Sequence, residues 1–228
     1  MTINVAKLGR VDYPEALVIQ EKLRQLRQQN VINDTLILLE HPPVLTLGVR
    51  GGHANILISE EYLKAQGVAI YKVKRGGDVT YHGPGQIVGY PIFNLMNHGK
   101  DLQGFVEKLK NVFIRLLKDE YGIAAVGGDK KLTGVWVGDE KITSIGLSFS
   151  RWISMHGFAF NVNTNLEHFK WINPCGFTDR GVTSLQKLLG KKLDIEGVNH
   201  QLVQYFSEVF DTSVEYVGQK WIDQVIGG

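Results

Sequence analysis

Cysteine is almost absent from this chain: Cys175 is the only one in 228 residues. A single cysteine excludes an internal disulfide framework and indicates a reducing compartment. An excess of one charge sign is missing too, because 25 Lys and Arg face 23 Asp and Glu and leave a formal net charge of +2. This balance gives no indication of a nucleic-acid or membrane surface.

Long apolar runs are also lacking. No segment approaches the roughly 20 apolar residues that a membrane-spanning helix needs. The opening MTINVAKLGRVDYPEA has no apolar region typical of a signal peptide. We therefore expect a cytoplasmic protein without a membrane partner. Hydrophobic residues make up 43% of the chain, enough to build a sizeable core.

Three segments have the apolar periodicity of helices. The first begins at Asp12, with Pro14 in its first turn. The second runs from Asp101 to about Tyr121 and is followed by Gly122 as a C-cap. The third covers residues 194–210, and a shorter helix is expected after Ser59. The strands that we expect are TLILLE, VLTLG, VAIYKV, LTGVWV, KITSIGLSFS and MHGFAFNV.

The expected strands include a hairpin turning at residues 138–140 and a last strand, 155–162, with one face buried. Hairpins mixed with helices favour an α/β (α+β) fold with a mixed sheet rather than a purely parallel one. We expect one domain spanning residues 1–228. Only the part from about residue 190 onward could form a small helical subdomain.

Glycine is concentrated in RGGDVTYHGPGQIVGYP, residues 75–91. Glycines let a backbone approach a ligand closely and offer its N–H groups. The spacing matches neither a P-loop nor a dinucleotide fingerprint. The segment could be a hairpin that merely turns, but the Arg, Tyr and His among its glycines favour a binding loop.

Three further positions are ambiguous when each is considered alone. Lys141 follows the turn at 138–140 and could be a surface lysine paired with Glu140 or Asp139. His156 lies in an apolar strand, where a histidine is commonly structural. Cys175 lies among the turn formers of WINPCGFTD, so it is a loop thiol that is either a small buried hydrophobe or a nucleophile.

Some classes of site are not expected. The seven histidines show no H-E-x-x-H or similar close pair, and no second cysteine exists, so we expect no metal site. A G-x-S-x-G sequence is absent, which argues against a serine hydrolase.

Several motifs occur together in one order: RGGDVTYHGPGQIVGYP, KITSIG, HGFAFNV, and NPCG followed by VTSL. In this combination, over residues 75–185, the chain resembles the lipoyl(octanoyl) transferases, also called the lipoate-protein ligase B family. Two positions depart from the family pattern, Thr143 where alanine is common and Phe177 where the residue varies. Neither affects the residues that carry the chemistry.

The resemblance implies a biotin/lipoate protein ligase-like catalytic domain, with a mixed sheet flanked by helices. It implies transfer of an octanoyl group from octanoyl-acyl carrier protein, through a cysteine thioester, to a specific lysine of lipoyl domains. This is the first step of endogenous protein lipoylation. The implied partners are acyl carrier protein, the lipoyl domains of 2-oxoacid dehydrogenase complexes and the glycine-cleavage H protein. No cofactor, ATP or metal is expected.

The resemblance also assigns residues. Cys175 would be the acyl-thioester nucleophile, and Lys141 would lower its pKa and act as general acid and base. Substrate-binding residues would be Arg75, Gly76, Gly77, Asp78, Val79, Thr80, Tyr81, His82, Ser144, Ile145, Gly146, Gly157, Phe158 and Ala159. We expect Tyr81, Phe158 and Ala159 to line a slot for the acyl chain. We expect His82 to orient groups rather than to act as the base.

Three alternatives remain open from the sequence. An ATP-dependent lipoate or biotin ligase on the same fold would form an adenylate and would not need Cys175. A cysteine thioesterase using Cys175 with His82 or His156 would release the free acid. A binding module for acylated carriers would form no covalent adduct.

Overall fold

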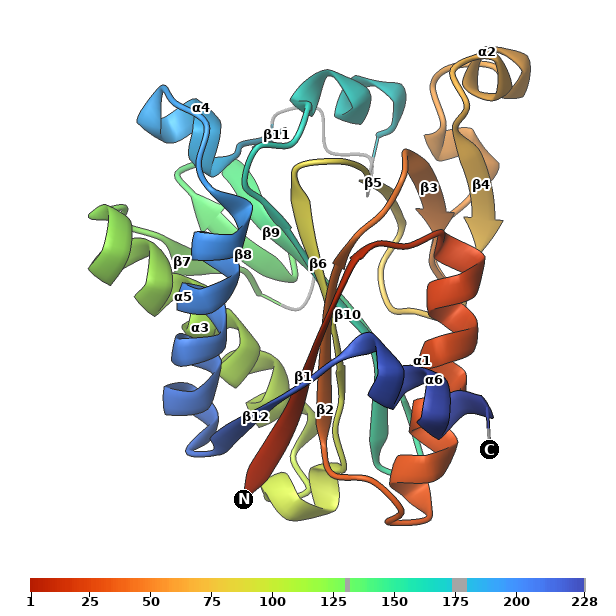
Figure 1. The fold of residues 1–228 in the computed structure, drawn as a ribbon. Coiled ribbons are helices and arrows are strands. Elements are labelled where there is room, and N and C mark those ends of the chain that lie inside the picture. The colour runs from red at the N-terminus through yellow and green to blue at the C-terminus, as the bar shows by residue number, and fades with distance from the viewer. Residues whose placement is uncertain (130–131, 174–179, 228) are drawn as a thin grey trace.

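The computed structural model describes residues 1–129, 132–173 and 180–227 (Figure 1). Across these residues the main sheet has nine strands in the order β12-β1-β2-β6-β10-β9-β8-β7, with β11 beside β9. Its strands are β1 (Thr2–Arg10), β2 (Thr35–Glu40), β6 (Gln86–Ile92), β7 (Val126–Gly127), β8 (Gly134–Val137), β9 (Glu140–Ser150), β10 (Ile153–Asn161), β11 (Gly181–Val182) and β12 (Ser213–Val217).

A smaller sheet of three strands has the order β4-β3-β5 within the described part of the chain. It consists of β3 (Val44–Leu47), β4 (Ala69–Lys72) and β5 (Val79–His82). The helices are α1 (Tyr13–Gln28), α2 (Glu60–Ala65), α3 (Leu102–Tyr121), α4 (Leu185–Leu189), α5 (Ile195–Phe210) and α6 (Gln219–Gly227). Short 3-10 turns are η1 (His53–Asn55), η2 (Leu95–His98) and η3 (Leu166–Trp171).

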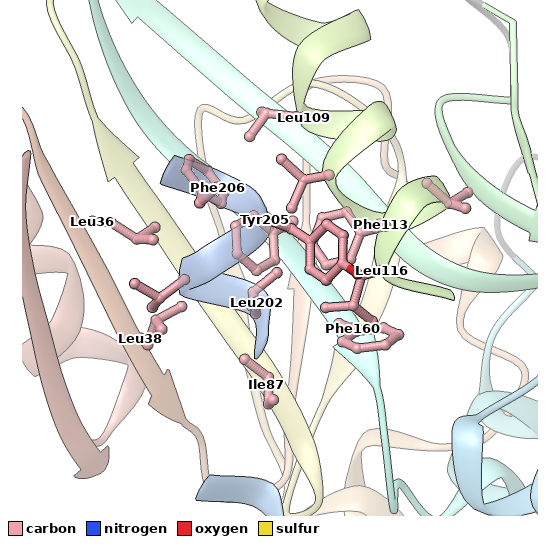
Figure 2. Close-up of a cluster of buried hydrophobic side chains, with 14 of the residues drawn as sticks. Leu36, Leu38, Ile87, Leu109, Phe113, Leu116, Phe160, Leu202, Tyr205 and Phe206 are labelled. Carbon is pink, nitrogen blue, oxygen red and sulfur yellow. The ribbon is translucent and has the colours of Figure 1, made fainter. Parts of the chain in front are cut away.

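Helices cover both faces of the main sheet, α3 and α5 on one side and α1 and α6 on the other (Figure 1). On the α3 side, the rings of Phe113 and Phe158 lie 4.9 Å apart, centroid to centroid, within a large apolar cluster (Figure 2). On the α1 side, Ala159 packs in a second cluster with Ile19 and Leu23. Strand β10 is therefore buried along its whole length. The expectation of one buried face was wrong, because helices lie on both sides.

The expected helices are confirmed, except that the Asp12 side chain makes no capping hydrogen bond at the start of α1. The Asp101 side chain accepts a hydrogen bond from the amide of Gln103 at 2.9 Å, and Gly122 closes α3 in the left-handed region with φ +65°. Ser59 caps α2 in the same way. The hairpin of β8 and β9 is also confirmed, with Gly138 at φ +56° in its turn.

The glycine-rich segment, residues 75–91, does not form a binding loop over its whole length, and its two strands do not pair as a hairpin. Its first half contains β5, which pairs with β3 in the small sheet. Its second half is β6, an interior strand of the main sheet between β2 and β10. Gly89 and Pro91 are residue types that disfavour an interior strand. Gly89 is nevertheless accommodated in β6 because a Cβ there would collide with the ring of Phe158, so the glycine permits close packing.

Strands β1 and β12 and helix α6 were not anticipated from local pattern. They lie together at one edge of the main sheet, where β12 pairs with β1 in parallel. In the described part of the chain, no helix is long and apolar enough to cross a membrane.

Candidate functional site

A cavity of about 820 Å³ opens over β9 and β10, with residues 75–82, η3 and β11 in its walls. Except for Tyr81, every described residue that the sequence assigned to the site lines this cavity. These are Arg75, Gly76, Gly77, Asp78, Val79, Thr80, His82, Lys141, Ser144, Ile145, Gly146, Gly157, Phe158 and Ala159. Cys175 lies outside the described residues.

Strand register brings together the two motifs on the cavity floor. In the antiparallel pairing of β9 with β10, Ser144 lies opposite Ala159 and Gly146 lies opposite Gly157. The glycine-rich wall joins the same floor, because the amide of Gly76 donates to the carbonyl of Leu147 at 2.9 Å. A Cβ at Gly146 would lie only 2.9 Å from the carbonyl oxygen of Gly76, so glycine allows this contact.

Tyr81 does not line the acyl slot as expected. Side chains alternate along a strand, so Tyr81 and its neighbour His82 point to opposite sides of β5. Tyr81 is fully buried in a separate apolar cluster, and its hydroxyl lies 2.7 Å from His168 Nδ1. It therefore supports the wall from behind.

Arg75 brings a buried positive charge to the wall. Its guanidinium donates to the Thr46 carbonyl at 2.7 Å and to the Thr46 hydroxyl at 2.8 Å. Its own side chain is only 7% exposed. Its charge helps to lower the pKa values of His82 and His156, after the larger effect of burial.

Lys141 lies in β9 at one end of the floor. Its Nζ is 4.8 Å from the ring centroid of Trp136, the residue opposite it in β8. Its neighbour Glu140 pairs with Lys187 at 2.5 Å.

The chain on both sides of residues 174–179 reaches the same cavity. Asn173 lines it and is anchored by its amide, which donates to the Asn55 carbonyl at 2.9 Å. Arg180 also lines it, with its guanidinium carbon 5.4 Å from the Trp136 ring. Val182 then lies opposite Lys141 in the parallel pairing of β11 with β9.

His82 is held in a hydrogen-bond network that extends to this region. Its Nδ1 lies 2.9 Å from Gln86 Oε1, an acceptor, so the ring N–H is on Nδ1 and Nε2 keeps its lone pair. Burial, together with the charges of His41 and Arg75, lowers the pKa of His82 to about 3. The ring is therefore neutral at physiological pH.

From Gln86 the network continues across the sheet. The Gln86 amide donates to Asn161 Oδ1 at 2.9 Å, and the Asn161 amide donates to the carbonyl of Thr183 at 3.0 Å. The amide of Thr183 donates to the carbonyl of Lys141 at 3.0 Å. The imidazole of His82 is thus oriented by bonds that lead to the backbone of Lys141.

The cavity also contains residues that the sequence analysis did not assign to it. Tyr13, Tyr90, Trp136 and His156 all line it and are all buried. The backbone of His156 has φ +59°, which is unusual for a residue other than glycine. Burial lowers the pKa of its imidazole to about 4. No local sequence signal marks the first three, because each lies in an ordinary helix or strand.

A metal centre finds no support in the described residues: they contain no group of three or more His, Cys, Asp or Glu side chains placed to hold an ion.

Comparison with known proteins places the chain in a family. Residues 12–207 match the lipoyl protein ligase A/B catalytic domain. An octanoyltransferase from Desulforamulus reducens is 57% identical over 227 residues, which cover 100% of this chain and 99% of that protein. An octanoyltransferase from Caldicellulosiruptor saccharolyticus is 56% identical over 226 residues, covering 99% of this chain and 96% of the relative.

Solved structures give the same fold at low identity. A lipoate-protein ligase A bound with ATP has a TM-score of 0.81 and 16% identity, covering 100% of this chain and 93% of that one. A biotin protein ligase from Aquifex aeolicus has a TM-score of 0.53 and 15% identity, covering 98% and 73% of the two chains. The expected biotin/lipoate protein ligase-like fold is confirmed.

Proposed function

The chain belongs to the lipoyl protein ligase A/B catalytic-domain family and is an acyltransferase that moves octanoyl groups in protein lipoylation, and we propose that it does so through a thioester on Cys175. The family resemblance read from the motifs and the octanoyl transfer that it implied are both confirmed. The acyl donor, the covalent intermediate and the roles of individual residues belong to the proposal.

One observation carries the proposal: the described residues that flank Cys175 lie at the cavity that contains Lys141. Asn173 precedes Cys175 by two positions and lines the cavity. On the other side, β11 is paired with β9 at Lys141. The described residues on both sides of Cys175 thus lie at the cavity that Lys141 lines.

In the first step, the Cys175 thiolate attacks the thioester carbonyl of octanoyl-acyl carrier protein. The bond between the acyl carbon and the phosphopantetheine sulfur breaks, and that sulfur leaves as a thiol after taking a proton from the Lys141 ammonium, which becomes a neutral amine. An ordinary cysteine, with a pKa of about 8.5, is only a few per cent ionised at neutral pH. The positive charge of Lys141 nearby favours the thiolate. Exchange of one thioester for another needs no ATP.

In the second step, the amine of a lipoyl-domain lysine attacks the Cys175 thioester. An amide bond forms, the bond to the Cys175 sulfur breaks, and the attacking nitrogen gives a proton to the neutral Lys141 amine, which restores the ammonium and the thiolate. An amide is more stable than a thioester, so this step gives the sequence its direction. Water in place of the lysine would give the free acid, as in a thioesterase.

The apolar part of the cavity suits a saturated chain. Ala159 lines it from β10 and is at least nine-tenths buried on the α1 face of the sheet, whereas Ile145 and Phe158, which also border the cavity, pack their side chains into the cluster on the α3 face. Burying one methylene contributes about 0.8 kcal/mol, so the length of the slot discriminates between acyl chains. His82, neutral and fixed by Gln86, is suited to orienting a polar group of the substrate.

An acyl donor and a lipoyl-domain acceptor follow from the family in general. We propose acyl carrier protein as the donor, and lipoyl domains of 2-oxoacid dehydrogenase complexes and the glycine-cleavage H protein as acceptors. We propose that no ATP, metal or other cofactor takes part and that the reaction occurs in the cytoplasm. We also propose that residues 1–228 work as one catalytic domain, because α5 packs with α3 in a single core.

The test is intact-protein mass spectrometry after incubation with octanoyl-acyl carrier protein, followed by a chase with an unmodified lipoyl domain. Wild type should gain one octanoyl group and lose it as the lipoyl domain gains it. Cys175→Ala should gain none and transfer none. Modification of the lipoyl domain by Cys175→Ala, or only with ATP and free octanoate, would overturn the thioester route in favour of a ligase.

A further inference from the structure

Two cations pack against the indole of Trp136 in the cavity wall. Lys141 Nζ lies 4.8 Å from the ring centroid, and the guanidinium carbon of Arg180 lies 5.4 Å from it. Both distances are within the roughly 6 Å over which the face of an aromatic ring attracts a cation. Trp136 therefore touches the proposed catalytic lysine and also the first described residue after the segment that carries Cys175.

The indole is itself held in place. Its Nε1 donates a hydrogen bond to the carbonyl of Leu132 at 2.9 Å, and the side chain is only 6% exposed. Gly128 lies against the same edge, where an added Cβ would come within 2.7 Å of Nε1. The register of β8 and β9 places Trp136 directly opposite Lys141. A lysine side chain is long and flexible, so a fixed ring face beside it restricts where its charge can lie.

We propose that Trp136 is a positioning residue of the acyl transfer, which holds the Lys141 ammonium in the cavity and anchors the chain at Arg180 to the same wall. The inference rests on the function proposed above. The negative face of the indole favours the ammonium over the neutral amine, and it offsets the repulsion between the two neighbouring cations. The positive charge thereby stays where it favours a nearby thiolate.

The sequence makes this measurable, because Cys175 is the only thiol in the chain. The pH dependence of alkylation by iodoacetamide therefore reports the ionisation of Cys175 alone. Trp136→Leu removes the ring face, Trp136→Phe keeps an aromatic face, and Trp221→Leu removes an indole from α6, away from the cavity. We expect Trp136→Leu to raise the thiol pKa by about one unit, so that alkylation at pH 7 slows roughly tenfold.

Trp136→Phe should retain most of the wild-type reactivity, and Trp221→Leu should match wild type. Octanoyl transfer by Trp136→Leu should lose kcat on the order of tenfold with little change in KM, because the ring does not contact the acyl chain in this proposal. A folded Trp136→Leu protein with the wild-type thiol pKa would overturn the proposal, since loss of packing alone lowers stability without changing the thiol.

A second measurement needs no variant at Trp136. In the NMR spectrum of the wild type, the ε-methylene protons of Lys141, assigned by their loss in Lys141→Arg, should be shifted upfield by the ring. An unshifted signal would overturn the proposal even if Trp136→Leu does not fold. This readout is independent of the cysteine. The two proposals can therefore fail separately. Octanoyl transfer by Cys175→Ala would overturn the thioester route, whereas an unshifted Lys141 signal would overturn the role of Trp136.

Discussion

Val182 lies directly opposite Lys141, in the two-residue parallel pairing of β11 with β9. The next amide, of Thr183, donates to the carbonyl of Lys141 at 3.0 Å. On its other side Lys141 faces Trp136 of β8. The backbone of this lysine is therefore held between two neighbouring strands, and a functional group on such a rigid element is positioned more precisely than one on a loop.

Lys141→Met keeps most of the length of the side chain and removes its amine, and with it the positive charge and the proton that it can transfer. We expect kcat/KM for octanoyl transfer to fall by about 10²- to 10⁴-fold, the usual contribution of a positioned acid or base. Single-turnover mass spectrometry measures acylation and deacylation separately. Lys118→Met, on the exposed end of α3, is the matched control and should behave as wild type. Acylation by Lys141→Met at the wild-type rate would contradict the role assigned to this lysine.

Ala159→Leu places a larger side chain in the proposed acyl slot. Ala159 is 3% exposed, lines the cavity and lies between Val88 of β6 and Ser144 of β9. Each methylene excluded from the slot costs about 0.8 kcal/mol, or roughly fourfold in kcat/KM. The ratio of octanoyl to hexanoyl transfer should therefore fall at least fourfold.

Competing octanoyl- and hexanoyl-carrier protein in one reaction measures that ratio directly. Ala65→Leu, on the exposed helix α2, adds the same side chain away from the cavity and should leave the ratio unchanged. A wild-type ratio in Ala159→Leu would remove this residue from the slot.

Three buried histidines should make stability depend on pH. Burial lowers the pKa values of His41, His82 and His156 to about 4, about 3 and about 4 respectively. In the unfolded chain their pKa is about 6.5. Below pH 6.5 the unfolded chain binds protons that the folded chain does not, so the free energy of unfolding falls as pH falls.

The stability that these histidines contribute is therefore complete above about pH 6.5 and is lost progressively toward pH 4. Urea unfolding at pH 7.5, 6 and 5 should show this fall, with an uptake approaching three protons on unfolding at the acid end. His82→Gln should reduce that uptake. Equal stability at pH 7.5 and 5 would be inconsistent with neutral, buried imidazoles.

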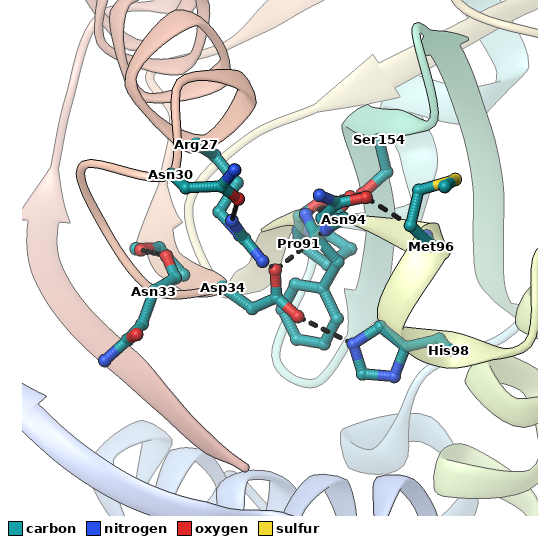
Figure 3. Close-up of polar contacts among 11 residues, drawn as sticks. Arg27, Asn30, Asn33, Asp34, Pro91, Asn94, Met96, His98 and Ser154 are labelled. Carbon is teal, nitrogen blue, oxygen red and sulfur yellow. Dashed lines mark hydrogen bonds and ion pairs between the residues drawn. The ribbon is translucent and has the colours of Figure 1, made fainter.

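Asp34 joins α1 to η2 through one carboxylate (Figure 3). It accepts hydrogen bonds from Arg27 Nε and His98 Nε2, both at 2.6 Å, and from the amide of Asn94 at 2.8 Å. Burial alone would raise the pKa of Asp34, but the bonds from His98 and Arg27 lower it below its usual value. This contribution to stability is present above about pH 4 and is lost as pH falls through the lowered pKa.

Asp34→Asn leaves the buried guanidinium of Arg27 without its carboxylate. We expect the free energy of unfolding to fall by about 3–5 kcal/mol, as for other broken buried ion pairs. Transfer activity per folded molecule should not change, because Asp34 lies outside the cavity. Adding Arg27→Met to Asp34→Asn should restore part of the loss, and a double variant less stable than Asp34→Asn would contradict the pairing.

The amino-acid sequence by itself determined several of the local elements. Helix α3 begins after Asp101 and ends before Gly122, because the Asp101 carboxylate caps the amide of Gln103 and a glycine accepts the left-handed conformation. The turn at Gly138 follows from the same local preference. The order of the motifs was sufficient to indicate the family, because a motif is defined by residue types and their spacing along the chain, and these can be identified without a structure.

Only the tertiary structure decided how strands far apart in the chain pair and which side chains meet. Strands β3 and β5 belong to the smaller sheet and not to the main one. The side chain of Tyr81 points away from the cavity, and Trp136 lies opposite Lys141. Periodicity reports which face of a segment is buried, but it does not say what covers that face. Pairing depends on contacts between residues far apart in the chain, and these are selected by how the whole core packs.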